Sequence, residues 1–169
     1  MPKSTAATIA PLPRATCPVV LLSPDLRATL LVVARTMASA REPWWVIGSA
    51  AVALHGAVPG AVGDVDVLLS VADATRLAPE MAMAPPPGTY AALFRSTLFG
   101  RWEGPPLPVE FMAELEVRRP EGWLRIAPLS RERVVLDGAA LFVPAREELR
   151  RILSAFGRPK DLARARLLG

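Results

Sequence analysis

Two neighbouring stretches decide the fold of this 169-residue chain: Trp45-Val-Ile-Gly-Ser-Ala-Ala-Val-Ala-Leu-His-Gly56 and Gly63-Asp-Val-Asp-Val-Leu-Leu69. The first opens inside a short apolar run, residues 44–47, which is typical of a buried strand. Gly48-Ser49 ends that strand, and Ala50 to His55 then form a compact helix closed by Gly56. The second stretch is a β-prone strand interrupted only by acids. Together they predict a strand, a tight corner, a helix and a second strand.

The remaining pattern predicts an α+β fold, with a small mixed sheet flanked by helices and further helices at the C-terminus. Ser23-Pro24-Asp25 is typical of a helix start, and this helix should reach about Ala40. We expect residues 1–22 to form a flexible arm and residues 23–169 a single domain. Further helices are expected over 72–83, 146–156 and 162–168, strands over 91–101 and 109–114, and a hairpin of 134–136 with 140–143.

Composition sets limits on the class of protein. Hydrophobic residues make up 51% and charged residues 21% of the chain, which is a globular rather than a disordered balance. The single cysteine, Cys17, excludes an internal disulfide and a cysteine-based metal cage. That cysteine content fits a reducing cytoplasm, where we expect the protein to be located. Three charges interrupt the apolar run 19–37, so we expect a soluble protein without a membrane span. The net charge of +4 suits triphosphates or RNA, and equally a solvated basic surface.

Asp64 and Asp66 are the first candidate site residues. Residues i and i+2 of a strand point to the same face, so the two carboxylates should project together. Such a pair in an otherwise apolar strand is costly unless a cation lies between its members. Ligands that are all oxygen favour Mg²⁺ or Mn²⁺ over zinc. The alternative is a solvated pair at a strand end with no role.

Gly48 and Ser49 are candidates for binding phosphate. Glycine permits a close backbone approach, and the first turn of a helix offers unpaired N–H groups to an anion. The alternative is that the Ser49 hydroxyl simply caps the helix. Because this corner and the aspartate pair lie within twenty residues of each other, the pattern favours a joint site for nucleotide and metal.

These two stretches resemble the DNA polymerase beta-type nucleotidyltransferase superfamily. They are similar in particular to small bacterial nucleotidyltransferase-like proteins, which include toxins of toxin–antitoxin and abortive-infection systems. The tail Arg146-Glu-Glu-Leu-Arg-Arg-Ile-Leu-Ser-Ala-Phe-Gly-Arg-Pro-Lys-Asp-Leu162 also resembles that group. The resemblance implies transfer of a nucleoside monophosphate from an NTP such as ATP, with Mg²⁺ or Mn²⁺, to an acceptor hydroxyl. RNA, protein and small molecules all stay open as acceptors.

The resemblance also implies a third carboxylate on a neighbouring strand, and Glu110 is the candidate. It would complete the metal shell or act as the base for the acceptor hydroxyl; the alternative is an ordinary edge-strand acid. Arg158 and Lys160 are the candidates for holding the triphosphate or a nucleic-acid backbone, with Asp161 orienting Lys160. A solvent-facing cap at a helix junction is the alternative for these residues.

Two features depart from the family pattern. Similar sequences commonly carry arginine and threonine just before the aspartate pair, where this chain has Pro59-Gly-Ala-Val-Gly63, and more often carry aspartate at the position of Glu110. A second hypothesis follows: a catalytically inactive member that binds nucleotide, RNA or a partner protein. A third is a toxin that is controlled by an antitoxin-like partner.

Overall fold

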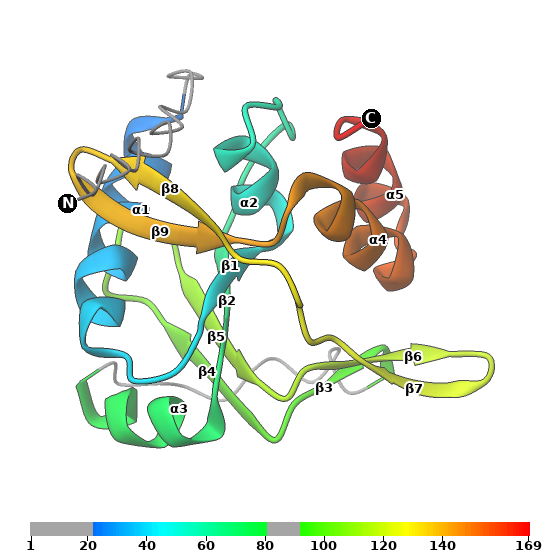
Figure 1. Ribbon diagram of the computed structural model, residues 1–169, viewed down its shortest axis with the longest axis horizontal. Helices are drawn as coiled ribbons and strands as arrows, with labels where there is room; N and C mark the ends of the chain where they lie inside the picture. Colours follow the sequence, from blue (N-terminus) through cyan, green and yellow to red (C-terminus); the bar gives the residue numbers. More distant parts are fainter. Residues whose placement is uncertain (1–21, 81–91) are drawn as a thin grey trace, which may run out of the picture.

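The computed structural model describes residues 22–80 and 92–169 of the chain (Figure 1). Its helices are α1 (Pro24–Thr36), α2 (Gly48–Leu54), α3 (Val71–Leu77), α4 (Arg146–Phe156) and α5 (Pro159–Arg166), with short 3₁₀ turns η1 (Met37–Ser39) and η2 (Ala78–Glu80). The strands are β1 (Trp45–Ile47), β2 (Val65–Leu69), β3 (Phe94–Arg95), β4 (Leu98–Trp102), β5 (Val109–Ala113), β6 (Glu116–Arg119), β7 (Gly122–Arg125), β8 (Glu132–Leu136) and β9 (Ala139–Val143). The α+β prediction is confirmed.

A four-stranded mixed sheet in the order β1-β2-β5-β4 forms the centre of the fold. Strands β2 and β5 run parallel, whereas β1 and β4 pair antiparallel with them on either side. Strand β5 is buried along its whole length, and every residue of β2 except Asp66 is buried too. Both strands are therefore apolar except at the one position where each carries an acid.

The remaining strands form two smaller sheets, β3-β6-β7 and the β8–β9 hairpin. Strand β9 packs against β1 and α1. The β6–β7 hairpin projects from the body on the same side as α4 and α5 (Figure 1). None of the helices in the described ranges is long and apolar enough to cross a membrane.

Local signals in the sequence placed several elements correctly. The Ser23 hydroxyl accepts a hydrogen bond from the Leu26 N–H at 3.2 Å, so it caps α1 as expected. Strands β1 and β2 and helix α4 also lie where they were predicted. The β8–β9 turn carries positive φ at Asp137 (49°) and Gly138 (81°), which is the backbone that a two-residue hairpin turn needs.

Other predictions were wrong in their bounds. Over the expected strand 91–101, a break after Arg95 separates β3 from β4, and the two strands join different sheets. The sequence prediction missed β6 and β7 altogether. Helix α5 starts at Pro159 rather than Leu162, because proline fits the first helical position, where no N–H is needed. The end of the predicted helix 72–83 and its stop at Pro85 lie outside the described residues.

Candidate active site

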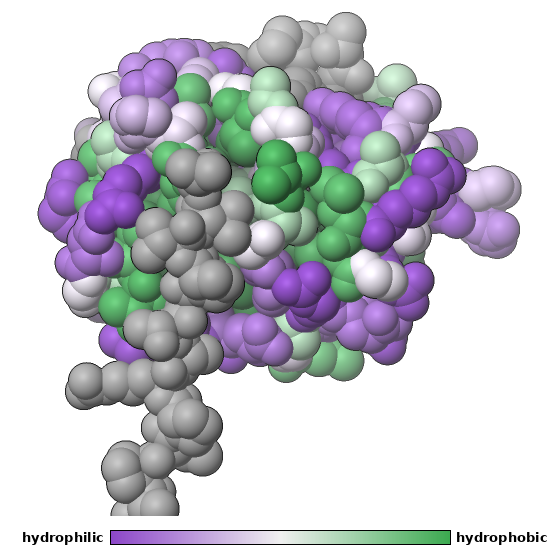
Figure 2. Space-filling model, turned by 90° about the horizontal axis from the view of Figure 1, so that it is seen from above, coloured by the Kyte–Doolittle hydropathy of each residue, from purple (hydrophilic) through white to green (hydrophobic). Residues whose placement is uncertain are grey.

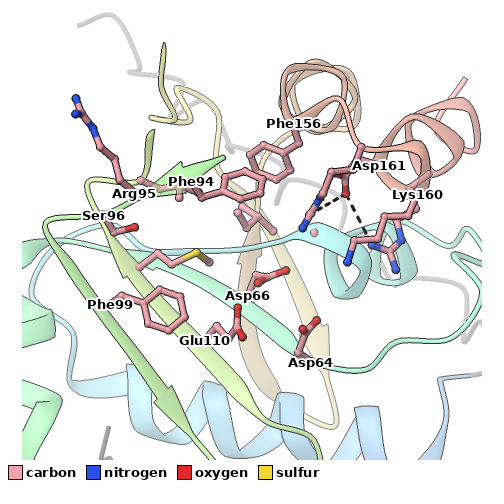
Figure 3. Close-up of a pocket in the computed structure, with 16 residues that line it drawn as sticks. Asp64, Asp66, Phe94, Arg95, Ser96, Phe99, Glu110, Phe156, Lys160 and Asp161 are labelled. Carbon is pink, nitrogen blue, oxygen red and sulfur yellow. Dashed lines mark hydrogen bonds and ion pairs between the residues drawn. The ribbon is translucent and has the colours of Figure 1, made fainter. Parts of the chain in front are cut away.

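A cavity of about 250 Å³ opens between the ends of β1, β2 and β5 and helix α5 (Figure 3). It brings together six of the seven candidate site residues: Gly48, Asp64, Asp66, Glu110, Arg158 and Lys160. Ser49 is 2% exposed in the first turn of α2 and does not line the cavity. Residues up to 112 positions apart in the sequence, from Gly48 to Lys160, therefore meet at one site.

Asp66 lies on the floor of this cavity, and Gly48 is pressed against it. Asp66 faces Ile47 across β1 and Glu110 across β5. A Cβ atom placed on Gly48 would collide with Asp66 Oδ2, and Gly48 also has φ of +64°, which side chains other than glycine rarely adopt. This position therefore requires glycine for two independent reasons.

Glu110 is not an edge-strand acid, because β5 is an internal strand of the sheet. Its side chain is 2% exposed, and Oε1 accepts a hydrogen bond from Arg101 Nη1 at 2.6 Å. Arg101 also donates through Nε to Glu103 Oε1 at 2.6 Å. The sequence prediction missed Arg101, although its position was available: Arg101 and Glu110 lie equally far from the Pro105-Pro106 turn, so a hairpin centred there pairs them.

The floor is short of positive charge. Loss of contact with water inside the cavity, and after it the neighbouring carboxylates of Asp64 and Glu110, together raise the pKa of the partly buried Asp66 from its ordinary value of 3.8 to about 8. Arg158 and Lys160 pull the pKa in the opposite direction without compensating. Asp64 sits one residue before β2 rather than within it, yet both aspartates line the same cavity.

Helices α4 and α5 supply the opposite rim, where cations outnumber acids. The cavity is lined there by Arg158, Lys160, Asp161 and Arg164. The structure contradicts the prediction that Asp161 orients Lys160. Asp161 is 1% exposed and binds Arg158 instead, with Oδ2 accepting from Nε at 2.5 Å and Oδ1 from Nη2 at 3.1 Å. Asp161 thus binds the Arg158 guanidinium through both carboxylate oxygens, and its Oδ1 also lies 3.9 Å from Arg164 Nη1. Lys160 is therefore the rim cation without a carboxylate partner in the described structure.

An apolar wall completes the cavity and was not predicted. Five side chains form it: Phe94, Phe99, Met112, Leu115 and Phe156. Phe94 and Phe156 meet edge to face with their centroids 5.1 Å apart. The Arg158 guanidinium lies 4.8 Å above the Phe94 ring, so the ring and the ion pair with Asp161 together hold it in place.

The carboxylates suit a hard divalent cation. Their oxygens are the ligands that Mg²⁺ and Mn²⁺ prefer, and the raised pKa of Asp66 indicates missing positive charge at that point. Across residues 22–80 and 92–169, no three Asp, Glu, His or Cys side chains are gathered as a ready-made metal site. Glu110 thus lines the cavity in an ion pair with Arg101 and does not form such a cluster with the two aspartates.

Comparison with solved structures identifies the fold. A Thermotoga maritima protein, described provisionally as a nucleotidyltransferase, is similar with a TM-score of 0.63 and 20% identity over 80% of this chain and 88% of that one. The solution structure of the antibiotic-resistance factor ANT(2'')-Ia is similar with a TM-score of 0.50 and 12% identity, covering 83% of each chain. No protein-family model matches the sequence, and no curated protein matches it either.

Proposed function

We propose that this chain, which has the nucleotidyltransferase fold, transfers a nucleoside monophosphate from an NTP to an acceptor hydroxyl, releasing pyrophosphate, with the help of Mg²⁺ or Mn²⁺. One observation carries the proposal: an acidic floor short of cations faces a basic rim across one small cavity. A divalent cation with a triphosphate has the charges that these two surfaces lack. The fold alone does not choose a function, and this arrangement of charges is the observation that supports the proposed one.

Asp64 and Asp66 are the residues proposed to hold the metal. A divalent ion held there would supply charge neutralisation for the attacking and leaving oxygens. Within the chain, Asp66 must lose the proton that its raised pKa retains, and Asp64 adds the second carboxylate beside it. Glu110 is proposed to join the metal shell or to accept the proton of the acceptor hydroxyl, which requires it to give up part of its contact with Arg101.

Gly48 and the rim residues are proposed to position the triphosphate. The missing side chain of Gly48 leaves room beside Asp66, and Ser49 follows it in the first turn of α2. Lys160 offers a point charge to the phosphates, whereas Arg158 is held by Asp161 and contributes its field and its position. Positioning and electrostatics carry most of a phosphoryl-type displacement, so this site needs no covalent nucleophile.

A transfer assay tests the proposal directly. The purified chain is incubated with each labelled NTP, Mn²⁺ or Mg²⁺, and a mixture of total RNA, proteins and small hydroxyl compounds. Label should move to an acceptor with the wild type and should not move with Asp64→Asn or Asp66→Asn. Nucleotide binding without transfer to any acceptor class would exclude the catalytic proposal.

A second candidate, a non-catalytic nucleotide- or partner-binding protein, is favoured by one observation. The third carboxylate is ion-paired with Arg101 at 2.6 Å, which removes one charge from the set that a metal needs. This candidate predicts NTP binding that is insensitive to Asp66→Asn. A role as a toxin stays a prediction: growth arrest on expression, relieved by a partner encoded beside it, would support it.

A further inference from the structure

The sheet β3-β6-β7 presents a solvent-facing surface of arginine and tryptophan beside the cavity. Strand register places five side chains on one face of this sheet: Arg95, Glu116, Arg118, Trp123 and Arg125. We call this set the arginine–tryptophan face. Its opposite face carries Phe94 and Val117, which pack toward the core, so the two faces of the sheet differ in chemistry.

Planar cations lie against the indole of this face. The Arg95 guanidinium lies 4.4 Å from the centre of the Trp123 ring, and that of Arg118 lies 5.4 Å from it. Arg95 is also ion-paired with Glu116 at 2.5 Å, and Arg125 with Glu114 at 3.0 Å. Arg118 has no carboxylate partner within the described ranges, so its charge is available to an anion.

The face continues into the cavity through β3. Arg95 and Ser96 line the cavity, and Phe94, on the opposite side of the same strand, belongs to its apolar wall. Figure 3 shows Arg95 pointing away from the acids while Asp64, Asp66 and Glu110 point inward. The projecting end of the β6–β7 hairpin shows a hydrophilic surface in the view from above (Figure 2). The face therefore meets the cavity only at its edge, where Arg95 and Ser96 line it, and the end of a chain lying on the face would have to pass this edge to enter the cavity.

We propose that the arginine–tryptophan face binds a short single strand of nucleic acid and that the 3′ hydroxyl of this strand is the acceptor in the cavity. In that step the hydroxyl oxygen bonds to the α-phosphorus of the NTP, the bond between this phosphorus and the oxygen that bridges to the β-phosphate breaks, pyrophosphate leaves, and the hydroxyl proton passes to Glu110 or to water. Guanidinium and indole planes stack on bases of any sequence, and guanidinium groups also bind phosphates. An acidic peptide would use the charges but not the stacking surface. Two strand spacings, about 10 Å, separate β3 from β7, which suits a few nucleotides of single strand.

The acceptor part of this inference rests on the proposed function, whereas the binding part does not. Binding is therefore measured first, without metal or NTP, by fluorescence anisotropy of short labelled single strands of RNA and of DNA in matched sequence. The wild type should bind at least one of them, with affinity that falls as salt rises. Trp123→Ala should weaken binding by roughly tenfold and Arg118→Gln by several-fold.

Matched variants keep the result interpretable. Trp123→Phe retains an aromatic plane and should recover much of the affinity if Trp123→Ala has removed a stacking contact. Arg133→Gln is the control for Arg118→Gln, because Arg133 is another exposed arginine on a strand, β8, that belongs to a separate sheet. Polyglutamate should bind weakly and should not distinguish Trp123→Ala from the wild type. Absence of strand binding, or equal binding by wild type and both Trp123 and Arg118 variants, overturns the inference.

Transfer then distinguishes the two proposals. Label from an NTP should be added to the bound strand and should be blocked by a 3′-phosphate on that strand. Strand binding that depends on Trp123 without any transfer leaves the binding face standing while the proposed function fails. Transfer to another acceptor class, without strand binding, contradicts the inference and leaves the proposed function standing.

Discussion

The acidic floor and the basic rim of the cavity are opposite in charge, and each keeps an excess of its own sign after its ion pairs are counted. On the sheet side, Arg101 offsets Glu110, and Asp64 and Asp66 remain. The rim carries the reverse excess: Asp161 pairs with Arg158 and, at 3.9 Å, with Arg164, so one acid faces three cations and Lys160 has no carboxylate partner in the described structure. A protein that used these charges only for stability would pair positive with negative side chains within the floor and within the rim. The separated excess indicates a ligand that carries both signs.

The floor and the rim also differ in the elements that carry them. The floor belongs to β2 and β5, which are surrounded by other strands, whereas the rim belongs to α5 close to the C-terminus. Changes on the floor should therefore affect chemistry and metal binding together. Changes on the rim should affect the binding of NTP and leave the fold largely intact.

The largest effect is expected for Asp66→Asn. Transfer should fall at least 100-fold, because loss of metal-derived charge stabilisation is worth several kcal/mol. The unfolding free energy in the absence of metal should rise at neutral pH, since a poorly compensated carboxyl is removed. Single-turnover transfer and chemical denaturation measure the two quantities. Asp137→Asn, in the β8–β9 turn, is the control: it should leave transfer unchanged and lower the unfolding free energy by at most about 1 kcal/mol through loss of an exposed ion pair with Arg27. Transfer that persists in Asp66→Asn would show that Asp66 does not hold the metal.

Gly48→Ala should be next in size. The new methyl group collides with Asp66 Oδ2, so the variant should lose about 1–3 kcal/mol beyond the backbone cost and bind Mn²⁺ and NTP weakly. Gly60→Ala is a matched control: its φ of +79° gives a similar backbone penalty, about 1–2 kcal/mol, but nothing lies within 4 Å of its added Cβ. Denaturant titration compares the two. Equal losses of unfolding free energy would show that backbone conformation, not contact with Asp66, explains why position 48 needs glycine.

On the rim, Lys160→Gln should raise KM for NTP roughly tenfold, as expected for the loss of one charge-assisted contact, with a smaller change in kcat. Arg166→Gln provides the comparison, because Arg166 lies in the last turn of the same helix and does not line the cavity. Steady-state kinetics with the preferred NTP gives both parameters. A Lys160→Gln variant whose kcat falls while KM stays constant would place Lys160 in the chemical step instead.

The smallest effect is a dependence on pH, because Asp66 is only partly buried and solvent screens much of its interaction with the neighbouring charges. With its pKa raised from 3.8 to about 8, Asp66 holds a proton in the folded state that the unfolded state has released. The metal-free unfolding free energy should therefore fall as pH rises from about 4 to about 8. Stabilisation by Mn²⁺ should grow over the upper part of that window, because the metal competes with the proton. Thermal unfolding across pH with and without Mn²⁺ measures both trends, and each should vanish in Asp66→Asn.

The acidic floor was largely predictable because its signals are local. An apolar run, Gly48-Ser49 and the spacing of Asp64 and Asp66 together predict a strand, a corner and a paired acid without any knowledge of the rest of the chain. Glu110 came only from a family resemblance, since a parallel partner strand can lie anywhere downstream. Arg101 could have been found by counting back from the Pro105-Pro106 turn.

The rest depended on tertiary contacts or on weaker signals. Strands β6 and β7 are short and rich in charge, so they lack the apolar alternation that predicts strands, although Pro120-Glu121-Gly122 is a turn signal between them. That Asp161 pairs with Arg158 rather than with Lys160 follows from the proline that starts α5 and from Phe94 beneath the guanidinium. Spacing along the chain does not contain that information.

The most direct test of the charge separation is to measure Mn²⁺ binding by electron paramagnetic resonance, with and without a non-hydrolysable NTP analogue. The proteins compared are the wild type, Asp66→Asn and Lys160→Gln. The predicted result has three parts. The wild type binds Mn²⁺ and binds it more tightly with the analogue, Asp66→Asn loses binding in both conditions, and Lys160→Gln binds Mn²⁺ but loses the gain from the analogue. Mn²⁺ binding that is the same in all three proteins would contradict a metal and nucleotide site between the floor and the rim.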